Sequence, residues 1–161
     1  MTIKIGDKMP AGSFGQMTDK GPGSISSDEL FAGKKVVLFS VPGAFTPTCS
    51  AKQLPGYLEL AEQLKAKGVD TIACLAVNDT FVMGAWGKHA GAEGKVSMLA
   101  DGNCAYTKAL GLELDASGFG MGTRGQRFAL VVDNGVVSQV HREAAASDVK
   151  ASSAENILAN L

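Results

Sequence analysis

Hydrophobic residues occur along this chain in short continuous runs, separated by stretches with helical periodicity. Each run is rich in β-branched or other apolar residues and holds few polar side chains, as is typical of a strand buried on both faces of a sheet. We therefore predict three buried strands, at Val36–Val41, Thr71–Val77 and Val96–Ala100.

The segments that follow these strands predict helices. After the first strand, apolar residues recur at helical spacing, and Gly68 ends the element. After the second strand, Asn78 or Asp79 can cap a helix, and a short apolar pattern follows the third strand. The predicted helices span residues 54–68, 78–89 and 103–110.

The C-terminal third of the chain predicts a β-hairpin. Two β-rich runs, Phe128–Asp133 and Val136–His141, flank the pair Asn134-Gly135. An Asn-Gly pair favours the type I′ turn, because that turn needs a positive φ at both central residues. We therefore expect two antiparallel strands joined by a tight turn at Asn134-Gly135.

The two ends of the chain carry weaker signals. Ser152 and Glu155 have the spacing of a capping box, so we expect a last helix from Ser152 to Leu161. Near the start, the alternation at Ile3–Ile5 predicts a short strand, and Ser26 or Ser27 caps a helical turn. The rest of residues 1–34 is weakly patterned.

This order of elements predicts a single α/β domain over residues 1–161. Strands that alternate with helices imply right-handed parallel crossovers within one sheet. The hairpin adds an antiparallel edge, and the last helix covers one face. The pattern therefore favours a thioredoxin-like fold with a central mixed β-sheet flanked by helices. A flavodoxin-like sheet fits less well, because it should not end in a tight hairpin.

Composition adds mainly exclusions. The chain has 161 residues and a formal net charge of −1, and no basic run suggests a nucleic-acid partner. No run approaches the roughly 18 apolar residues of a membrane-spanning helix. The first residues lack the apolar core of a signal peptide, so we expect a cytoplasmic protein. Three cysteines with His89 and His141 match no compact ligand set, so we expect neither a metal nor a cofactor.

One cysteine stands in an unusual context. The stretch PGAFTPTC, from Pro42 to Cys49, directly follows the first buried strand. If Thr46 is the N-cap, Pro47 takes the first helical position, where its missing N–H costs nothing, and Cys49 falls in the first turn. Unpaired amides and the helix dipole concentrate positive charge there. Such a position stabilises a thiolate, which is both the nucleophile and the form that peroxides oxidise.

The other two cysteines have plainer explanations. Cys74 lies in the middle of a predicted strand, where a core position is expected. Cys104 would also lie in a first turn if Asp101 caps its helix, but it lacks the proline-framed approach, and we expect a surface or packing role. Pro55-Gly56 should kink or bulge the helix after Cys49. This interruption either divides the helix into two elements or lets its first turn loosen after oxidation.

These residues resemble a known family. The spacing Pro42-x-x-x-Thr46-x-x-Cys49 is similar to the active-site motif of the peroxiredoxins. The wider match includes LPGYLELAEQLKAKGVD, LADG and GTRGQRFALVVD, covers nearly the whole chain, and points to the peroxiredoxin-five subfamily with its plant type II enzymes. The resemblance implies a thiol peroxidase that reduces hydrogen peroxide and alkyl hydroperoxides and protects against oxidative stress.

The resemblance also implies a role for each motif residue. Cys49 is the peroxidatic cysteine, whose thiolate attacks a peroxide oxygen and becomes a sulfenic acid. The Thr46 hydroxyl hydrogen-bonds the sulfur and the peroxide, and Pro42 packs over the site and keeps water from the sulfur. Arg127 corresponds to the family's active-site arginine, which favours the thiolate. Arg124 is a weaker candidate that supports Arg127.

The reductive half of the cycle stays open. Animal relatives carry a resolving cysteine near the C-terminus, where this chain has Ala151, whereas plant-type relatives have a second cysteine at the position of Cys74. Cys74 is therefore a candidate resolving residue, although its Cα must come within about 7 Å of that of Cys49 to form a disulfide, which requires local unfolding. Otherwise glutathione, glutaredoxin or thioredoxin acts as the reductant, and we slightly favour this external thiol. Many relatives also have a histidine in place of Gln53, which leaves local hydrogen bonding open.

Two other functions are compatible with the residues alone. A non-catalytic thioredoxin-like redox sensor would oxidise at Cys49 without rapid turnover. A glutathione-dependent thiol transferase would reduce disulfides, although this chain has no CxxC motif. Members of the resembling subfamily commonly form homodimers beside the active site, so we expect a homodimer with contacts at GAFTP and at the Phe81–Trp86 helix.

Overall fold

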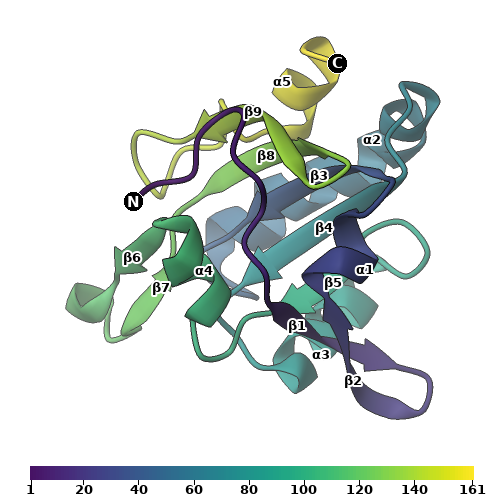
Figure 1. The fold of residues 1–161 in the computed structure, drawn as a ribbon. Helices are drawn as coiled ribbons and strands as arrows, with labels where there is room; N and C mark the ends of the chain where they lie inside the picture. Colours follow the sequence, from purple (N-terminus) through teal and green to yellow (C-terminus); the bar gives the residue numbers. More distant parts are fainter.

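A seven-stranded mixed β-sheet forms the centre of the protein in the computed structural model, which describes residues 1–161 (Figure 1). The strand order is β2-β1-β5-β4-β3-β8-β9, with β3, β4 and β5 parallel and the outer strands antiparallel. A separate two-stranded ribbon pairs β6 with β7. The strands are β1 (Ser13–Thr18), β2 (Gly21–Ser26), β3 (Lys35–Ser40), β4 (Thr71–Ala76), β5 (Ser97–Ala100), β6 (Glu113–Asp115), β7 (Thr123–Gly125), β8 (Phe128–Asp133) and β9 (Val136–Arg142).

Helices cover both faces of this sheet. Residues of α2, α3 and α5 pack with one set of strand residues in one hydrophobic core, and those of α1 and α4 pack with the other set in a second core. A π-helical segment, Cys49–Gln53, precedes α2, and a short 3₁₀ turn spans Ser117–Phe119. The α-helices are α1 (Ser27–Phe31), α2 (Leu54–Ala66), α3 (Thr80–Ala90), α4 (Ala105–Leu110) and α5 (Ala154–Ala159).

Strand β3 shows why the apolar runs are continuous. Val37 and Phe39 face the core under α2, α3 and α5, whereas Val36 and Leu38 face the core under α1 and α4. All four side chains are fully buried, because neighbouring residues of a strand point to opposite faces and both faces are covered. The three predicted strands and the helices between them are therefore confirmed, with small shifts at their ends.

The predicted hairpin is also confirmed. Asn134 and Gly135 have φ angles of 49° and 80°, as a type I′ turn requires, and they join β8 to β9 at one edge of the sheet. The N-terminal segment runs along the start of β9. There the Gly6 N–H donates to the Val137 carbonyl, the Val137 N–H donates to the Asp7 carbonyl, and Lys8 forms an isolated bridge with Val136.

The first 34 residues contain more structure than their pattern indicated. The predicted strand at Ile3–Ile5 is wrong, because Ile3 is buried with its N–H bonded to the Leu110 carbonyl, whereas Ile5 is 65% exposed. Instead, β1 and β2 form an unpredicted hairpin at the other edge of the sheet. Ser26 caps α1 through a reciprocal bond with Glu29, which confirms one of the two expected caps.

The start of the last helix differs from the prediction. Ser153, not Ser152, is the N-cap of α5, since its hydroxyl accepts a hydrogen bond from the Asn156 N–H. Ser152 is fully buried and makes contacts that face the interior instead. The helix also ends earlier than expected, at Ala159.

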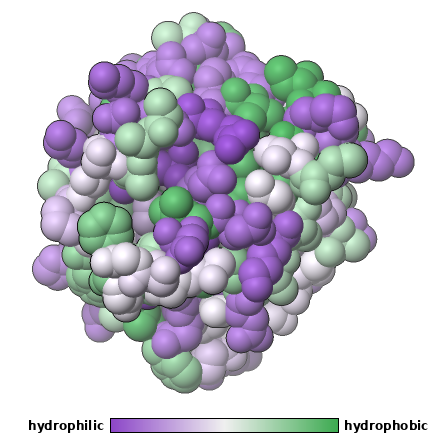
Figure 2. Space-filling model, turned by 90° about the vertical axis from the view of Figure 1, so that its left-hand side faces the viewer, coloured by the Kyte–Doolittle hydropathy of each residue, from purple (hydrophilic) through white to green (hydrophobic).

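The surface of the protein mixes hydrophobic and hydrophilic side chains. Figure 2 shows the face on the β6–β7 side, where small hydrophobic areas are separated by hydrophilic ones. The longest helix, α2, has 13 residues, and no helix combines the length and apolar character needed to cross a bilayer.

Two glycines with left-handed backbone allow a matched test of packing. Gly33 has φ +69° with open space around it, whereas Gly111 has φ +72° and a Cβ there would collide with the Met1 carbonyl. We expect Gly33→Ala to lower the free energy of unfolding by about 1–2 kcal/mol, the strain of a left-handed alanine. Gly111→Ala should lose at least about 1 kcal/mol more, because of the clash. Urea unfolding measures both; equal losses would mean that the N-terminus simply moves aside.

Candidate active site

The segment between β3 and α2 places Cys49 inside the protein. Pro42 is buried two residues after the end of β3, and the helical conformation begins at Pro47 as predicted. Cys49 is fully buried in the core under α2, α3 and α5. Thr46 precedes the first helical residue, but its hydroxyl donates to the Gly43 carbonyl over 2.7 Å, and no side-chain cap is formed.

Cys49 is the first residue of a π-helical turn, Cys49–Gln53, which ends shortly before Pro55. The Leu54 N–H donates to the Cys49 carbonyl, five residues back, instead of to the residue four back. Pro55 has no N–H to continue the α-helical ladder, and its ring would crowd the carbonyl four residues earlier. The wider turn relieves both constraints, so the predicted bulge in this helix is confirmed.

The central contact of the site joins Cys49 to Arg127. Arg127 lies just before β8 and is only 3% exposed. Its Nη2 donates to the Cys49 sulfur over 3.2 Å, its Nη1 donates to Gln53 Oε1, and its Nε donates to the Ala146 carbonyl over 2.8 Å. Residues far apart in the sequence thus meet around one guanidinium group.

This buried guanidinium has no carboxylate partner. The only salt bridge in the structure joins Lys4 and Asp7. An isolated charge is costly to bury unless a group of opposite charge or strong hydrogen bonds compensate it. The Cys49 sulfur is the one atom bonded to the Arg127 guanidinium that can carry a full negative charge.

A polar network extends from Arg127 toward the C-terminus. Gln53 is 1% exposed, and its Nε2 donates to Ser152 Oγ over 3.1 Å. Ser152 Oγ in turn donates to Glu143, and the Tyr57 hydroxyl donates to the Ser152 carbonyl over 2.7 Å. Burial raises the pKa of Glu143, but hydrogen bonds from the Ser152 hydroxyl and from three backbone N–H groups outweigh it, so this pKa lies below its usual value.

The structure distinguishes the two arginines. Arg124 does not bond to Cys49 or Arg127; its Nη1 donates to the Val77 carbonyl over 2.9 Å and its Nε to the Met121 carbonyl over 2.8 Å. It therefore ties the β7 strand to the loop after β4. These contacts do not include Arg127, so the expected support of Arg127 by Arg124 is not seen.

The other two cysteines lie away from exposed surface. Cys74 is fully buried in β4, paired with Phe39 of β3 and Met98 of β5. Burial, and secondarily the nearby Cys49, raise the pKa of Cys74 well above its ordinary value. Cys104 is buried at the N-cap of α4 with φ 61°, which agrees with the packing role but places it before the first turn. All three cysteines are free thiols.

Sequence reasoning missed the network behind Arg127. The spacing of Ser152 predicts a helix cap, Gln53 stands where many relatives have a histidine, and the sequence around Glu143 and Ala146 carries no signal of a buried contact. Their partners lie far away in the sequence, 99 positions for the Gln53–Ser152 bond. A polar Gln53 within an otherwise apolar helical face was the one local signal of a buried contact.

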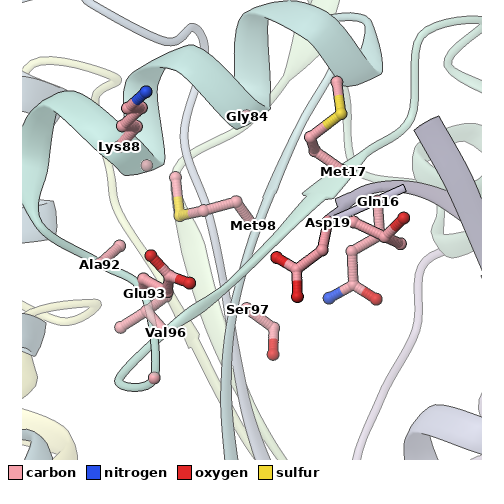
Figure 3. Close-up of a pocket in the computed structure, with 13 residues that line it drawn as sticks. Gln16, Met17, Asp19, Gly84, Lys88, Ala92, Glu93, Val96, Ser97 and Met98 are labelled. Atoms are coloured by element: carbon pink, nitrogen blue, oxygen red, sulfur yellow. The ribbon is translucent and has the colours of Figure 1, made fainter. Parts of the chain in front are cut away.

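A cavity of about 490 Å³ lies between β1, α3 and β5, and its lining has neither cysteine nor arginine. Figure 3 shows the carboxylates of Asp19 and Glu93 on opposite sides of it. The structure also brings together no group of three or more His, Cys, Asp and Glu side chains that could hold a metal ion. No cysteine therefore lines this cavity, and the contact between Cys49 and Arg127 is separate from it.

Comparison with known proteins identifies the family and agrees with the fold. Residues 4–158 match the Redoxin family. Peroxiredoxin-2B of Arabidopsis thaliana is 48% identical over 157 residues, which cover 97% of this chain and 96% of that protein. Reduced Prx3 from Vibrio vulnificus, solved in complex with hydrogen peroxide, is 55% identical with a TM-score of 0.94 over 99% of both chains. A Plasmodium falciparum antioxidant protein, described as a 1-Cys peroxiredoxin, is 32% identical with a TM-score of 0.89 over 96% of both chains.

These matches define a redoxin-type thiol protein with a thioredoxin-like fold, which confirms the predicted fold class. More narrowly, the chain belongs to the peroxiredoxin family and is similar to its plant type II members. Peroxiredoxins are thiol peroxidases, so membership favours this activity over the redox sensor and the thiol transferase that the residues alone allowed.

The contact between Arg127 and Cys49 makes a direct prediction. Arg127→Ala removes the buried donor and positive charge, so we expect the second-order rate with hydrogen peroxide to fall by at least about 100-fold, as for other preorganised donors. Arg124→Ala is the matched control and should change this rate far less, since Arg124 bonds only to carbonyls. Stopped-flow peroxide consumption measures both, with circular dichroism to check folding. Equal losses in the two variants would contradict the assignment.

The lowered pKa of Glu143 predicts how the network responds to acid. A carboxyl whose pKa is lower in the folded state than in the unfolded state stabilises the fold at pH values above its usual pKa, near 4.3. That contribution is lost as the pH falls through the folded pKa. Glu143→Gln should therefore lower the free energy of unfolding at pH 7, and its difference from wild type should shrink toward pH 3. Urea unfolding at several pH values measures this, with the exposed Glu59→Gln as control. A difference that stays constant with pH would contradict it.

Proposed function

We propose that Cys49 is the peroxidatic cysteine of this peroxidase. Its thiolate sulfur attacks one oxygen of the peroxide, an S–O bond forms and the O–O bond breaks. The sulfur is oxidised to sulfenic acid, and the departing oxygen takes up a proton to leave as water or an alcohol. The observation that carries this proposal is the 3.2 Å contact between the Cys49 sulfur and a buried guanidinium without a carboxylate partner.

The neighbouring residues suit the same reaction. Arg127 favours the thiolate and can stabilise charge that moves onto the peroxide oxygens. The Thr46 hydroxyl donates its hydrogen bond to the Gly43 carbonyl, so its oxygen is available to accept a hydrogen bond from a hydroperoxide. Pro42 is buried beside this turn and helps to limit water at the sulfur. Hydrogen peroxide and alkyl hydroperoxides are the proposed substrates, supported by the peroxide complex of the Vibrio vulnificus relative.

For the reductive step we propose an external thiol. Cys74 is fully buried in the middle of β4 between two paired strands, and its raised pKa keeps it a neutral, weakly nucleophilic thiol. The relative described as a 1-Cys peroxiredoxin supports a cycle without a second cysteine. Glutathione, glutaredoxin or thioredoxin would attack the sulfenic acid, release water and form a mixed disulfide that a second thiol reduces. Cys74 stays a non-essential resolving candidate that needs local unfolding.

A homodimer and a cytoplasmic location also belong to this proposal. Phe45 is 50% exposed beside the ring of Trp86, and Phe81 on the same helix as Trp86 is 65% exposed. Exposed aromatic side chains of this kind are enriched at protein interfaces, which supports the expected contact region. Analytical ultracentrifugation tests the dimer. Fractionation of cells tests the location expected from the sequence.

The product of a single oxidation separates the two reductive routes. After one equivalent of hydrogen peroxide, we expect mass spectrometry to find sulfenic acid at Cys49, trapped by dimedone, and a mixed disulfide when glutathione is added. Cys74→Ser should keep most of its turnover with glutathione and glutaredoxin, because the buried thiol is not required. Complete loss of turnover with accumulating sulfenic acid would make Cys74 obligatory.

Two further cysteine variants serve as controls. Cys49→Ser removes the nucleophile and should abolish peroxide consumption. Cys104→Ser should leave it unchanged, since Cys104 sits at the start of α4 and does not contact Arg127. Peroxide turnover by Cys49→Ser at the wild-type rate would refute the proposed function as a whole.

A further inference from the structure

The turn that leads to Cys49 has a strained backbone. Phe45 has a φ angle of 63°, in the left-handed region that bulky side chains rarely adopt. We propose that Asn78 is a positioning residue for peroxide attack: it holds this strained turn and so places the Thr46 hydroxyl for the hydroperoxide. The inference rests on the proposed function of Cys49 and assigns a role to a residue that does not itself touch the peroxide.

Residues 43–46 form a hydrogen-bonded turn. The Thr46 N–H and the Thr46 hydroxyl both donate to the Gly43 carbonyl, over 3.4 Å and 2.7 Å. Phe45 is the third residue of this turn, where a positive φ normally requires glycine or asparagine. Local preference therefore does not account for the shape of the turn, and contacts from elsewhere in the fold have to stabilise it.

Asn78 makes one of these contacts. Its Oδ1 accepts a hydrogen bond from the Ala44 N–H over 2.9 Å, at a partly buried position. A backbone N–H can only donate, so the atom that faces it must be the oxygen of the amide. Ala44 directly precedes Phe45, so this bond restrains the turn at the residue before its strained point. Asn78 is itself well placed, because it lies between the buried Val77 and Asp79, the N-cap of α3.

Helix α3, which begins two residues after Asn78, restrains the same region at further points. The centroid of the Phe45 ring lies 5.8 Å from that of His89 and 6.4 Å from that of Trp86, distances typical of favourable ring pairs. Trp86 Nε1 also donates to Ser50 Oγ over 3.1 Å. Asn78 and α3 together therefore contact the chain both before and after the end of the turn.

These restraints determine where the Thr46 oxygen lies. A Cβ at Gly43 would be 3.0 Å from Thr46 Cγ2, so the threonine already packs closely on this glycine. Its hydroxyl donates to the Gly43 carbonyl, which leaves the oxygen to accept from a hydroperoxide. Loss of the Asn78 bond would let the turn relax and move this oxygen. The contact between Arg127 and Cys49 does not involve Asn78 and should stay in place.

The test compares Asn78→Ala and Asn78→Asp with wild type. Alanine removes the acceptor, so we expect the second-order rate with hydrogen peroxide to fall about 10-fold or more, since a small misplacement near the reacting atoms is costly. Aspartate keeps an acceptor oxygen and should retain more of this rate. Alkylation of Cys49 by iodoacetamide should stay close to wild type in Asn78→Ala, because it needs no hydrogen bond to a hydroperoxide. The control, Asn103→Ala, changes an exposed asparagine in the loop after β5 and should behave as wild type.

A double-variant cycle shows whether Asn78 acts through Thr46. Thr46→Val keeps the shape of threonine but removes the hydroxyl. In this background Asn78→Ala should cause little further loss of the peroxide rate, because the oxygen that Asn78 places is already absent. A further loss as large as that in wild type would overturn the proposal. A wild-type rate in the folded Asn78→Ala protein, or an Asn78→Asp protein no faster than Asn78→Ala, would overturn it too.

Further outcomes separate positioning from damage to the fold, which circular dichroism checks in each variant. If Asn78→Ala does not fold, Asn78→Gln takes its place, because it keeps the amide but moves its oxygen by the length of one methylene group. The same loss of rate is then expected, and a wild-type rate overturns the proposal. Equal losses of peroxide rate and alkylation rate also overturn it. Wild-type protein that consumes no peroxide would instead defeat the proposed function of Cys49.

Discussion

The site depends on a positive charge buried without an acidic partner. Arg127 is 3% exposed and bonds to an amide oxygen, a backbone carbonyl and the Cys49 sulfur. The amide oxygen and the carbonyl accept hydrogen bonds from the guanidinium but do not compensate its charge, and the sulfur is the one acceptor that can carry a full negative charge. Folding assembles this contact, since the sheet, the π-helical turn and residues 143–153 all have to be in place for these groups to meet.

The fold brings these groups together from three directions. β3 leads into the turn that carries Cys49, Arg127 lies just before β8, and the chain beyond β9 supplies Ala146 and Ser152. β3 and β8 are hydrogen-bonded neighbours in the sheet, so the ends of two adjacent strands fix the reactive pair. Binding and catalytic residues are commonly held on loops beside such a rigid sheet. The cavity between β1, α3 and β5 has no cysteine and no arginine in its lining.

The sequence pattern was sufficient to predict strands that are buried on both faces and a turn that requires particular residues. Continuous apolar runs identified β3, β4 and β5, and Asn134-Gly135 identified the β8–β9 turn. The β1–β2 hairpin escaped detection, because GPGSIS in β2 is short of apolar residues and its side chains are mostly exposed. Cys49 and Arg127 could be named from their motif. The roles of Gln53 and Ser152 could not, because a bond across 99 positions depends on the whole fold and a local capping pattern competed for the same serine.

The two edges of the central sheet limit how copies of the chain can associate. β2 at one edge contains Pro22, which has no N–H to offer a further strand, with glycines on both sides. At the other edge, residues 6–9 already bond to the beginning of β9 and to the turn before it. Main-chain pairing with another molecule is therefore disfavoured at Pro22 of one edge and at the beginning of β9 on the other, which are the places where an added strand would meet no free N–H or an edge already paired.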